Sequence, residues 1–91
     1  MTDEVRNNEA ESQYELEVEG ELALAAYRLS DGRIVFTHTE VPDALEGRGI
    51  GSKLIEAALD DVRTKGLKVV PACAFVKHYI EKHPEVQDLL A

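Results

Sequence analysis

Cysteine is nearly absent from this sequence, and its rarity limits both the chemistry and the compartment. The 91 residues contain one cysteine, Cys73, so no disulfide can form within the chain. A single free thiol is typical of proteins from a reducing compartment. The acidic, polar residues 1–13 do not resemble a secretory signal or a transit peptide. We therefore expect a cytoplasmic location.

Basic residues are too few for a nucleic-acid-binding surface. Ten Lys and Arg stand against eighteen Asp and Glu, which gives a formal net charge of −8. Residues 1–21 hold eight of the acidic residues and one base. Nucleic acid binding needs a basic patch that displaces counterions from phosphates, so we expect no nucleic acid partner. Residues 1–12 have little apolar content, and we expect them to be a disordered acidic tail.

Long apolar runs, internal repeats and metal-ligand spacings are also missing. The longest apolar run is residues 22–27, far short of the ~20 residues of a membrane helix. The three histidines, Cys73 and the acidic residues show no spacing typical of a metal site. We therefore expect no membrane span and no metal. The length fits one small domain, which we place at residues 13–91.

The residue patterns predict an α+β domain that begins with an antiparallel β-meander. Residues 14–20 alternate apolar side chains with glutamates, which predicts a strand whose glutamate face is exposed to water. Residues 22–30 and 33–41 are rich in strand-forming residues. The dipeptide Asp31-Gly32 between them is a strong signal for a two-residue hairpin turn.

After residue 49 the apolar period changes from two to about 3.6, which predicts an amphipathic helix that ends at Gly66. Residues 67–73 read as a fourth strand, and residues 74–83 as a second helix. Residues 84–90 read as a final short helix that begins at Pro84. The residues expected to face the core from the two longer helices are Ile50, Leu54, Ile55, Ala58, Leu59, Val62, Phe75, Val76, Tyr79 and Ile80.

Three glycines stand at the start of the first helix, in the sequence EGRGIGSKL at residues 46–54. The first N–H groups of a helix lack intrahelical partners and lie at the positive end of its dipole. Glycines there let a ligand approach the backbone, an arrangement suited to phosphate. Arg48 and Lys53 add positive charge, and Ser52 adds a hydroxyl. The spacing matches neither the P-loop nor the dinucleotide fingerprint.

With the meander before it, the segment EVPDALEGRGIGSKL resembles the GNAT superfamily of N-acetyltransferases. The hallmark of that superfamily, [QR]-x-x-G-x-[GA], falls on residues 46–51, with Glu46 in place of Gln or Arg. The segments HTEVP, GRGIGSKLIEAAL, VPACAFV and YIEKHPE extend the resemblance over residues 14–90. They resemble the minimal, single-domain branch, often called YjdJ-like.

The resemblance implies a GNAT-like fold with a V-shaped gap between the last two strands and acetyl-CoA as the cofactor. The pantetheine arm would pair with residues 38–41 and pass through the gap. Backbone amides at residues 48–52 would hold the pyrophosphate. The residues expected to bind the cofactor are Val41, Arg48, Gly49, Ile50, Gly51, Ser52 and Lys53.

Four residues are candidates for catalysis. The resemblance places Cys73 near the thioester as a nucleophile, although free cysteines are often small buried hydrophobes. His38 and Glu40 share one strand face and could act as the base that deprotonates an amine, or form a surface pair. The resemblance implies that Tyr79 is the general acid that protonates the leaving thiolate. Its position on an amphipathic helix also fits an aromatic residue of the core.

We therefore expect a small N-acetyltransferase that moves an acetyl group from acetyl-CoA to an amine. Two alternatives stay open: a module that binds CoA or acyl-CoA without turnover, and a protein-interaction domain that uses the sheet face. Full-length GNAT enzymes carry further elements that build the acceptor site, for which 91 residues have no room. The acceptor and the oligomeric state are not encoded in any pattern of the sequence.

Overall fold

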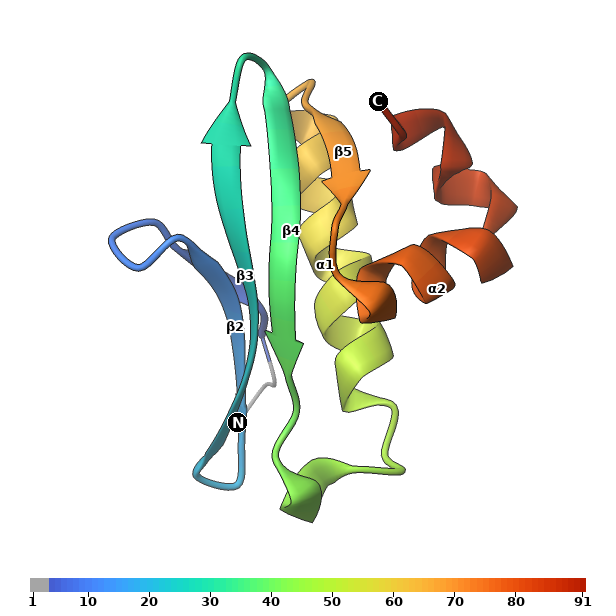
Figure 1. Cartoon of the computed structure of the whole chain (residues 1–91). Coiled ribbons are helices and arrows are strands. Elements are labelled where there is room, and N and C mark those ends of the chain that lie inside the picture. The colour runs from blue at the N-terminus through green and yellow to red at the C-terminus, as the bar shows by residue number, and fades with distance from the viewer. Residues whose placement is uncertain (1–3) are drawn as a thin grey trace.

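The structure, a computed structural model, describes residues 4–91 and contains a five-stranded sheet with two α-helices (Figure 1). The strands follow chain order across the sheet; the first four are antiparallel to their neighbours and β5 is parallel to β4. This mixed sheet confirms the α+β class. The elements are β1 (Arg6–Asn8), β2 (Gln13–Val18), β3 (Glu21–Ser30), β4 (Arg33–Glu40), η1 (Asp43–Leu45), α1 (Ile50–Thr64), β5 (Lys68–Pro71), α2 (Ala74–Lys82) and η2 (Pro84–Leu89).

Two tight turns produce the meander. Asp31 and Gly32 have φ angles of 51° and 76°, so the hairpin predicted between β3 and β4 is confirmed. Glu19 and Gly20, with φ angles of 54° and 81°, make the same kind of turn between β2 and β3. Positive φ at both central residues matches the right-handed twist of the flanking strands.

A β-bulge in β4 sets the direction of the last side chains of that strand. Phe36 pairs with Tyr27, but the next residue of β3, Ala26, pairs with His38, so Thr37 is an extra residue. A bulge shifts the alternation of side chains by one position. Beyond it, Thr39 pairs with the buried Ala25 and shares its side of the sheet.

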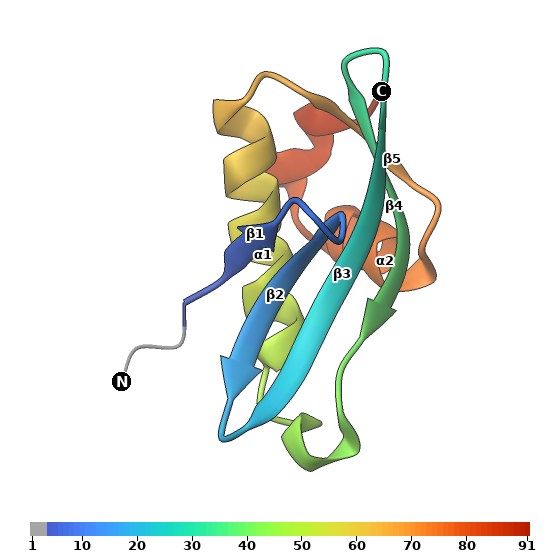
Figure 2. The same ribbon diagram turned by 90° about the vertical axis from the view of Figure 1, so that its left-hand side faces the viewer.

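Both α-helices pack on one face of the sheet, which places them behind the strands in Figure 2. The apolar stripe predicted for α1 is buried, and Gly66 ends the helix with a left-handed φ of 70° and a Leu67 N–H bond to the Val62 carbonyl. In α2, Val76, Tyr79 and Ile80 are buried as predicted.

One prediction about the C-terminal third needs correction, and the short helix predicted to begin at Pro84 is confirmed. Phe75 was expected in the core, but its side chain is 40% exposed, because it lies on the flank of α2 that faces the start of α1. The final segment forms a 3₁₀ helix, η2, after which Leu90 bridges to Val69 of β5. The Ala91 N–H donates to the Val69 carbonyl at 3.0 Å, so the chain end covers the outer edge of β5.

The N-terminal residues also differ from the sequence-based expectation. Disorder was predicted for residues 1–12; residues 1–3 lie outside the described part, but β1 pairs with β2 through Arg6 and Glu15 and their neighbours. Glu15 was expected on a wet face, yet it is 4% exposed. The predictions of disorder at residues 6–8 and of an exposed Glu15 were wrong for the same reason. A sequence pattern does not show which polar side chains will form hydrogen bonds with one another in the fold.

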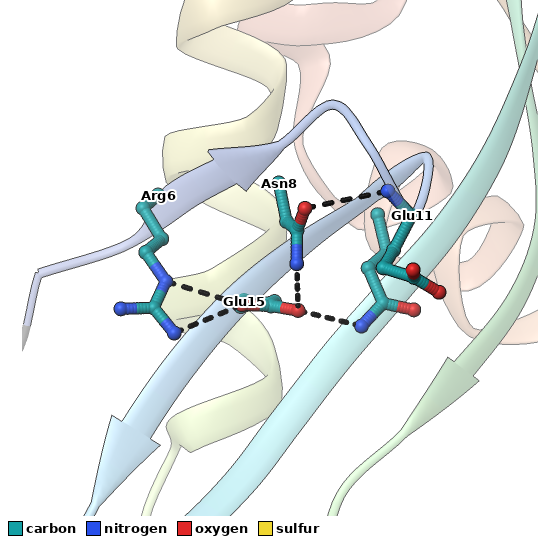
Figure 3. A network of polar contacts seen from close by, with 5 residues as sticks. Arg6, Asn8, Glu11 and Glu15 are labelled. Atoms are coloured by element: carbon teal, nitrogen blue, oxygen red, sulfur yellow. Dashed lines mark hydrogen bonds and ion pairs between the residues drawn. The ribbon is translucent and has the colours of Figure 1, made fainter.

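Glu15 is buried because three side chains satisfy its carboxylate (Figure 3). Gln13 donates to it at 2.6 Å, Asn8 at 2.9 Å and Arg6 at 3.1 Å. The Asn8 side chain in turn accepts the Glu11 N–H at 3.3 Å. Buried charge is tolerated when it is paired and hydrogen-bonded, so this network fixes β1 on the sheet.

The described chain shows neither a membrane span nor a metal cluster. Within residues 4–91 no helix is long and apolar enough to cross a membrane. The same residues contain no group of three His, Cys, Asp or Glu side chains arranged to hold a metal ion.

Candidate functional site at the start of α1

The gap expected between the last two strands begins halfway along β4. The parallel pairing of β4 with β5 joins Arg33 to Lys68 and ends where Phe36 meets Pro71. Strand β4 continues to Glu40, whereas β5 stops at Pro71 and the chain turns into α2. The two strands therefore part, and the far end of β4 keeps backbone groups that β5 does not pair. Such groups can pair with an extended ligand.

One side-chain contact crosses this gap. The hydroxyl of Thr39 lies 3.2 Å from Sγ of Cys73. The bulge turns Thr39 toward this side of the sheet, and Cys73 is half-buried at the N-cap of α2. The structure thus places Cys73 at the end of the gap.

A hollow of about 800 Å³ lies between the end of β4 and the start of α1. The end of β4, the η1 loop and the first turn of α1 supply most of its wall, and α2 supplies one aromatic ring. Five of the seven predicted cofactor-binding residues line it, and Glu40 is its one predicted catalytic residue. The lining residues are Thr39, Glu40, Val41, Pro42, Leu45, Glu46, Gly47, Gly49, Ile50, Gly51, Ser52 and Phe75.

Three backbone N–H groups at the start of α1 stand at this hollow. Gly49 is the N-cap, and the first intrahelical bond runs from the Lys53 N–H to the Gly49 carbonyl at 3.0 Å. The N–H groups of Ile50, Gly51 and Ser52 precede that bond, and no side chain caps them. They lie at the positive end of a 15-residue helix. An anion held there meets donors and a favourable dipole together.

The glycines of this loop serve two different purposes. Gly49 has a left-handed φ of 72°, which favours glycine, and the space beside its Cα is open, with no atom within 4 Å of an added Cβ. Gly51 is helical and buried, and a Cβ there would collide with the ring of Phe75. The sequence suggested that Gly51 clears the backbone for a ligand; in the structure it also makes room for Phe75.

The two cations predicted at this site lie outside the wall of the hollow. Arg48 forms a bidentate ion pair with Glu19 of the β2–β3 turn, with both N–O distances 3.0 Å. The hydrogen bonds and charge of Arg48 lower the pKa of the Glu19 carboxyl. Lys53 is exposed on α1. Arg48 therefore tethers the glycine loop to the meander, a role that the sequence pattern did not reveal.

His38 and Glu40 form a hydrogen-bonded pair at the surface, which is one of the two arrangements that the sequence analysis allowed. His38 Nε2 lies 2.7 Å from a carboxylate oxygen of Glu40, and both side chains are more than half exposed. Glu40 lines the hollow and His38 does not. Through the pair, the imidazole is held beside the carboxylate that reaches the hollow.

Tyr79 does not line the large hollow. It is buried, and its ring stacks on His83 with centroids 3.9 Å apart. Burial, together with the charges of Glu56, Glu85 and Asp60, raises the pKa of Tyr79, so the phenol stays protonated. It lines a second, smaller hollow rather than the large one. This placement matches the core-aromatic alternative more closely than contact with a thioester in the gap.

Sequence reasoning missed Thr39 and Phe75 as residues of the site. Thr39 carried no motif, and its direction depends on the bulge at Thr37. Phe75 looked like a core residue of an amphipathic helix. The nearby glycine was the available signal, because a large ring can approach a helix backbone closely only where a Cβ is missing.

Comparison with known proteins agrees with this geometry. Residues 13–89 match the family described as GCN5-related N-acetyl-transferase. The chain belongs to this family. The resemblance read from the sequence is thereby confirmed, and the N-acetyltransferase hallmark is the glycine loop that opens onto the hollow.

A solved structure and several curated proteins are similar to the chain. The solution NMR structure of a GCN5-like candidate N-acetyltransferase from Staphylococcus aureus superposes with a TM-score of 0.76 at 34% identity. The match covers 100% of this chain and 91% of that one. This likeness confirms the GNAT-like fold. Protein NATD1 from chicken and from mouse is 43% identical over 68 residues, which are 74% of this chain and 62% of each relative. The human protein is equally identical over 60% of its length. The match thus spans about three fifths of these relatives.

Proposed function

We propose that this chain is an acetyl-CoA-dependent N-acetyltransferase that moves an acetyl group to an amine. The observation that carries the proposal is the continuity of the site. Three unpaired N–H groups of α1 face the same hollow as the free end of β4, beside the gap to β5. CoA has a diphosphate that joins its nucleotide to an extended, amide-containing arm, and the diphosphate and the arm need such donors and such a strand edge.

The residues present fit this cosubstrate. Gly49 leaves the N-cap open for phosphate oxygens, and the hollow of about 800 Å³ accommodates a group of this size. Bound acetyl-CoA would supply an activated thioester. Val41 and the end of β4 would hold the arm, and Ile50 to Ser52 would hold the diphosphate. Arg48 and Lys53 would contribute positive charge from outside the wall.

Two groups would assist the transfer. Only a neutral amine attacks a thioester, so a base must take its proton. Glu40 lines the hollow and is hydrogen-bonded to His38, so these two side chains are the candidate base. Cys73 lies at the end of the gap against Thr39 and could accept the acetyl group before the amine does.

A CoA-binding module without turnover is the second candidate function. It is favoured by the position of Tyr79, which lines the smaller hollow and not the large one. No other described residue stands out as the acid that protonates the leaving thiolate. The acceptor amine is not defined by either reading. The single thiol also leads us to propose a cytoplasmic location.

Titration with acetyl-CoA tests the proposal. At about 100 times Kd, a ligand that binds the folded state stabilises it by roughly 2.7 kcal/mol. Amide NMR signals of Ile50, Gly51 and Ser52 should shift, while that of Gly66 at the other end of α1 should not. Gly49→Val should weaken binding, since its branched side chain enters the open N-cap. Absence of any response at millimolar acetyl-CoA would refute both candidate functions.

Turnover separates the two candidates. The enzyme should release free CoA from acetyl-CoA in the presence of an amine mixture, or transfer the acetyl group to itself. Binding without either product would favour the module. Equal affinity in Gly49→Val would show that the diphosphate lies elsewhere.

A further inference from the structure

The glycine loop, residues 46–49, is exposed and rich in glycine. All four residues are exposed, between the buried Leu45 and Ile50. Gly47 and Gly49 have left-handed φ angles of 81° and 72°, and no side chain caps α1 at Gly49. Glycine loses more conformational freedom on folding than any other residue. A loop of this composition must therefore be ordered before it can hold a ligand, and ordering it during binding lowers affinity.

The Arg48 side chain attaches this loop to the turn between β2 and β3. Its two terminal nitrogens each donate to one carboxylate oxygen of Glu19, both at 3.0 Å. The loop and the turn lie at the same, lower end of the molecule in Figures 1 and 2. A bidentate pair fixes the direction of the guanidinium as well as its distance. Because Arg48 stands between Gly47 and Gly49, this contact restricts the backbone on both sides of it.

Glu19 is an unusual residue for the position that it occupies. It is the first central residue of a two-residue turn and has a φ of 54°. Positive φ in such turns favours Gly, Asn and Asp, the last two because a short polar side chain can hydrogen-bond locally. The β3–β4 hairpin has the same kind of turn and follows this preference, with Asp31 at a φ of 51°. The turn itself therefore does not account for a glutamate at position 19.

We propose that Glu19 is a positioning residue for acetyl-CoA: through Arg48 it holds the glycine loop in the conformation that presents the first N–H groups of α1. The inference rests on the proposed function, because it concerns binding at those groups. A glutamate reaches Arg48 from the turn, whereas the favoured asparagine is one methylene shorter and has no charge. Residues that break a local preference are expected where function requires them.

The effect of this tether on binding is opposite in sign to that of simple charge. Removing an acid near a phosphate site should strengthen anion binding, by reducing repulsion or by releasing Arg48 from Glu19. Losing the tether should weaken binding, because the ligand must then order the loop. The side chains of Arg48 and Glu19 are 44% and 68% exposed. For an exposed pair we expect the affinity for acetyl-CoA to fall roughly twofold to fivefold.

Glu19→Asn tests the proposal, because asparagine suits the turn but cannot form the ion pair. Calorimetric titration should show weaker binding of acetyl-CoA, while the urea midpoint of unfolding does not fall. The matched control is Glu21→Gln, which removes the same charge two residues along the chain. The Glu21 side chain is exposed and makes no hydrogen bond or ion pair within residues 4–91. The control should bind acetyl-CoA at least as tightly as the wild type.

A double-mutant cycle shows whether Glu19 acts through Arg48. Arg48→Ala should itself weaken the binding of acetyl-CoA. Adding Glu19→Asn to that variant should change the affinity little further, because the contact is already lost. Additive losses in the double variant would overturn the inference.

The outcomes separate this inference from the proposed function. Unchanged or tighter binding of acetyl-CoA by Glu19→Asn would overturn the inference and leave the proposed function intact. A lower urea midpoint in Glu19→Asn would also overturn it, because the fold itself would then require the glutamate. Failure of the wild-type protein to bind acetyl-CoA would refute the proposed function.

Discussion

The buried Glu15 carboxylate should stabilise the fold measurably, and Glu15→Gln is the substitution that tests this. The glutamine has nearly the same shape, but it has no charge and exchanges one acceptor oxygen for an NH2 group. Gln13 and Asn8 both donate to the same carboxylate oxygen, and Arg6 donates to the other. Whichever way the new amide is oriented, its NH2 group therefore faces Arg6 or both Gln13 and Asn8, which are themselves donors.

The magnitude follows from these three contacts. A hydrogen bond to a charged group contributes about 1.5–3 kcal/mol, against about 1 for a neutral pair. When the charge is lost, the hydrogen bonds from Gln13 and from Asn8 should each stabilise the fold by about 1 kcal/mol less. Arg6 is 67% exposed, so its ion pair adds only about 0.5 kcal/mol. The total is about 2.5 kcal/mol, which lowers Tm by roughly 10–20 °C in a domain of this size.

Urea unfolding at pH 7 measures the effect against a matched control. Glu17→Gln removes the same charge two residues along the same strand, where the side chain is exposed. Its free energy of unfolding should change by less than about 0.5 kcal/mol. Similar losses in the two variants would refute the reasoning, because the effect would then come from net charge and not from the network.

The pH dependence gives an independent check. Hydrogen bonds from Gln13 and Asn8 lower the pKa of Glu15, against the opposing effect of burial, and Arg6 lowers it further. A depressed pKa in the folded state gives stability that is present above the unfolded pKa of about 4.3. That stability is lost as the pH falls through the folded pKa. The difference between wild type and Glu15→Gln should therefore shrink below about pH 4; a constant difference down to pH 2 would contradict it.

Three further predictions concern the site. Cys73→Ala should abolish self-acetylation while acetyl-CoA affinity, measured by titration, changes less than about twofold; an unchanged acetylation signal would exclude the covalent role. Thr39→Val should slow alkylation of Cys73 by iodoacetamide severalfold, because the hydroxyl 3.2 Å from the sulfur is lost, and Thr39→Ser should restore the rate. Gly51→Ala should destabilise the wild type by overpacking against Phe75, yet stabilise a Phe75→Ala background by about 0.5–1 kcal/mol through helix propensity; urea unfolding that shows the same sign in both backgrounds would contradict this.

Local chemistry in the sequence determined the elements after β1 and the glycine loop. Alternation with period two, the Asp31-Gly32 turn, the change to a helical period after residue 49 and the Gly66 stop each depend on neighbouring residues. These signals can be read along the chain, because backbone preference and side-chain spacing decide them. The hallmark at residues 46–51 is local in the same way, and it led to the correct family.

Contacts between distant segments were decided only by the tertiary structure. Glu15 is buried because Asn8 and Arg6 reach it from β1, and Arg48 pairs with Glu19, 29 residues away. The bulge at Thr37 turns Thr39 toward Cys73, which no periodicity along β4 could show. The physical reason is that charge pairing, register and side-chain packing depend on which surfaces meet. A sequence pattern describes one strand or helix at a time and does not show which other element it will contact.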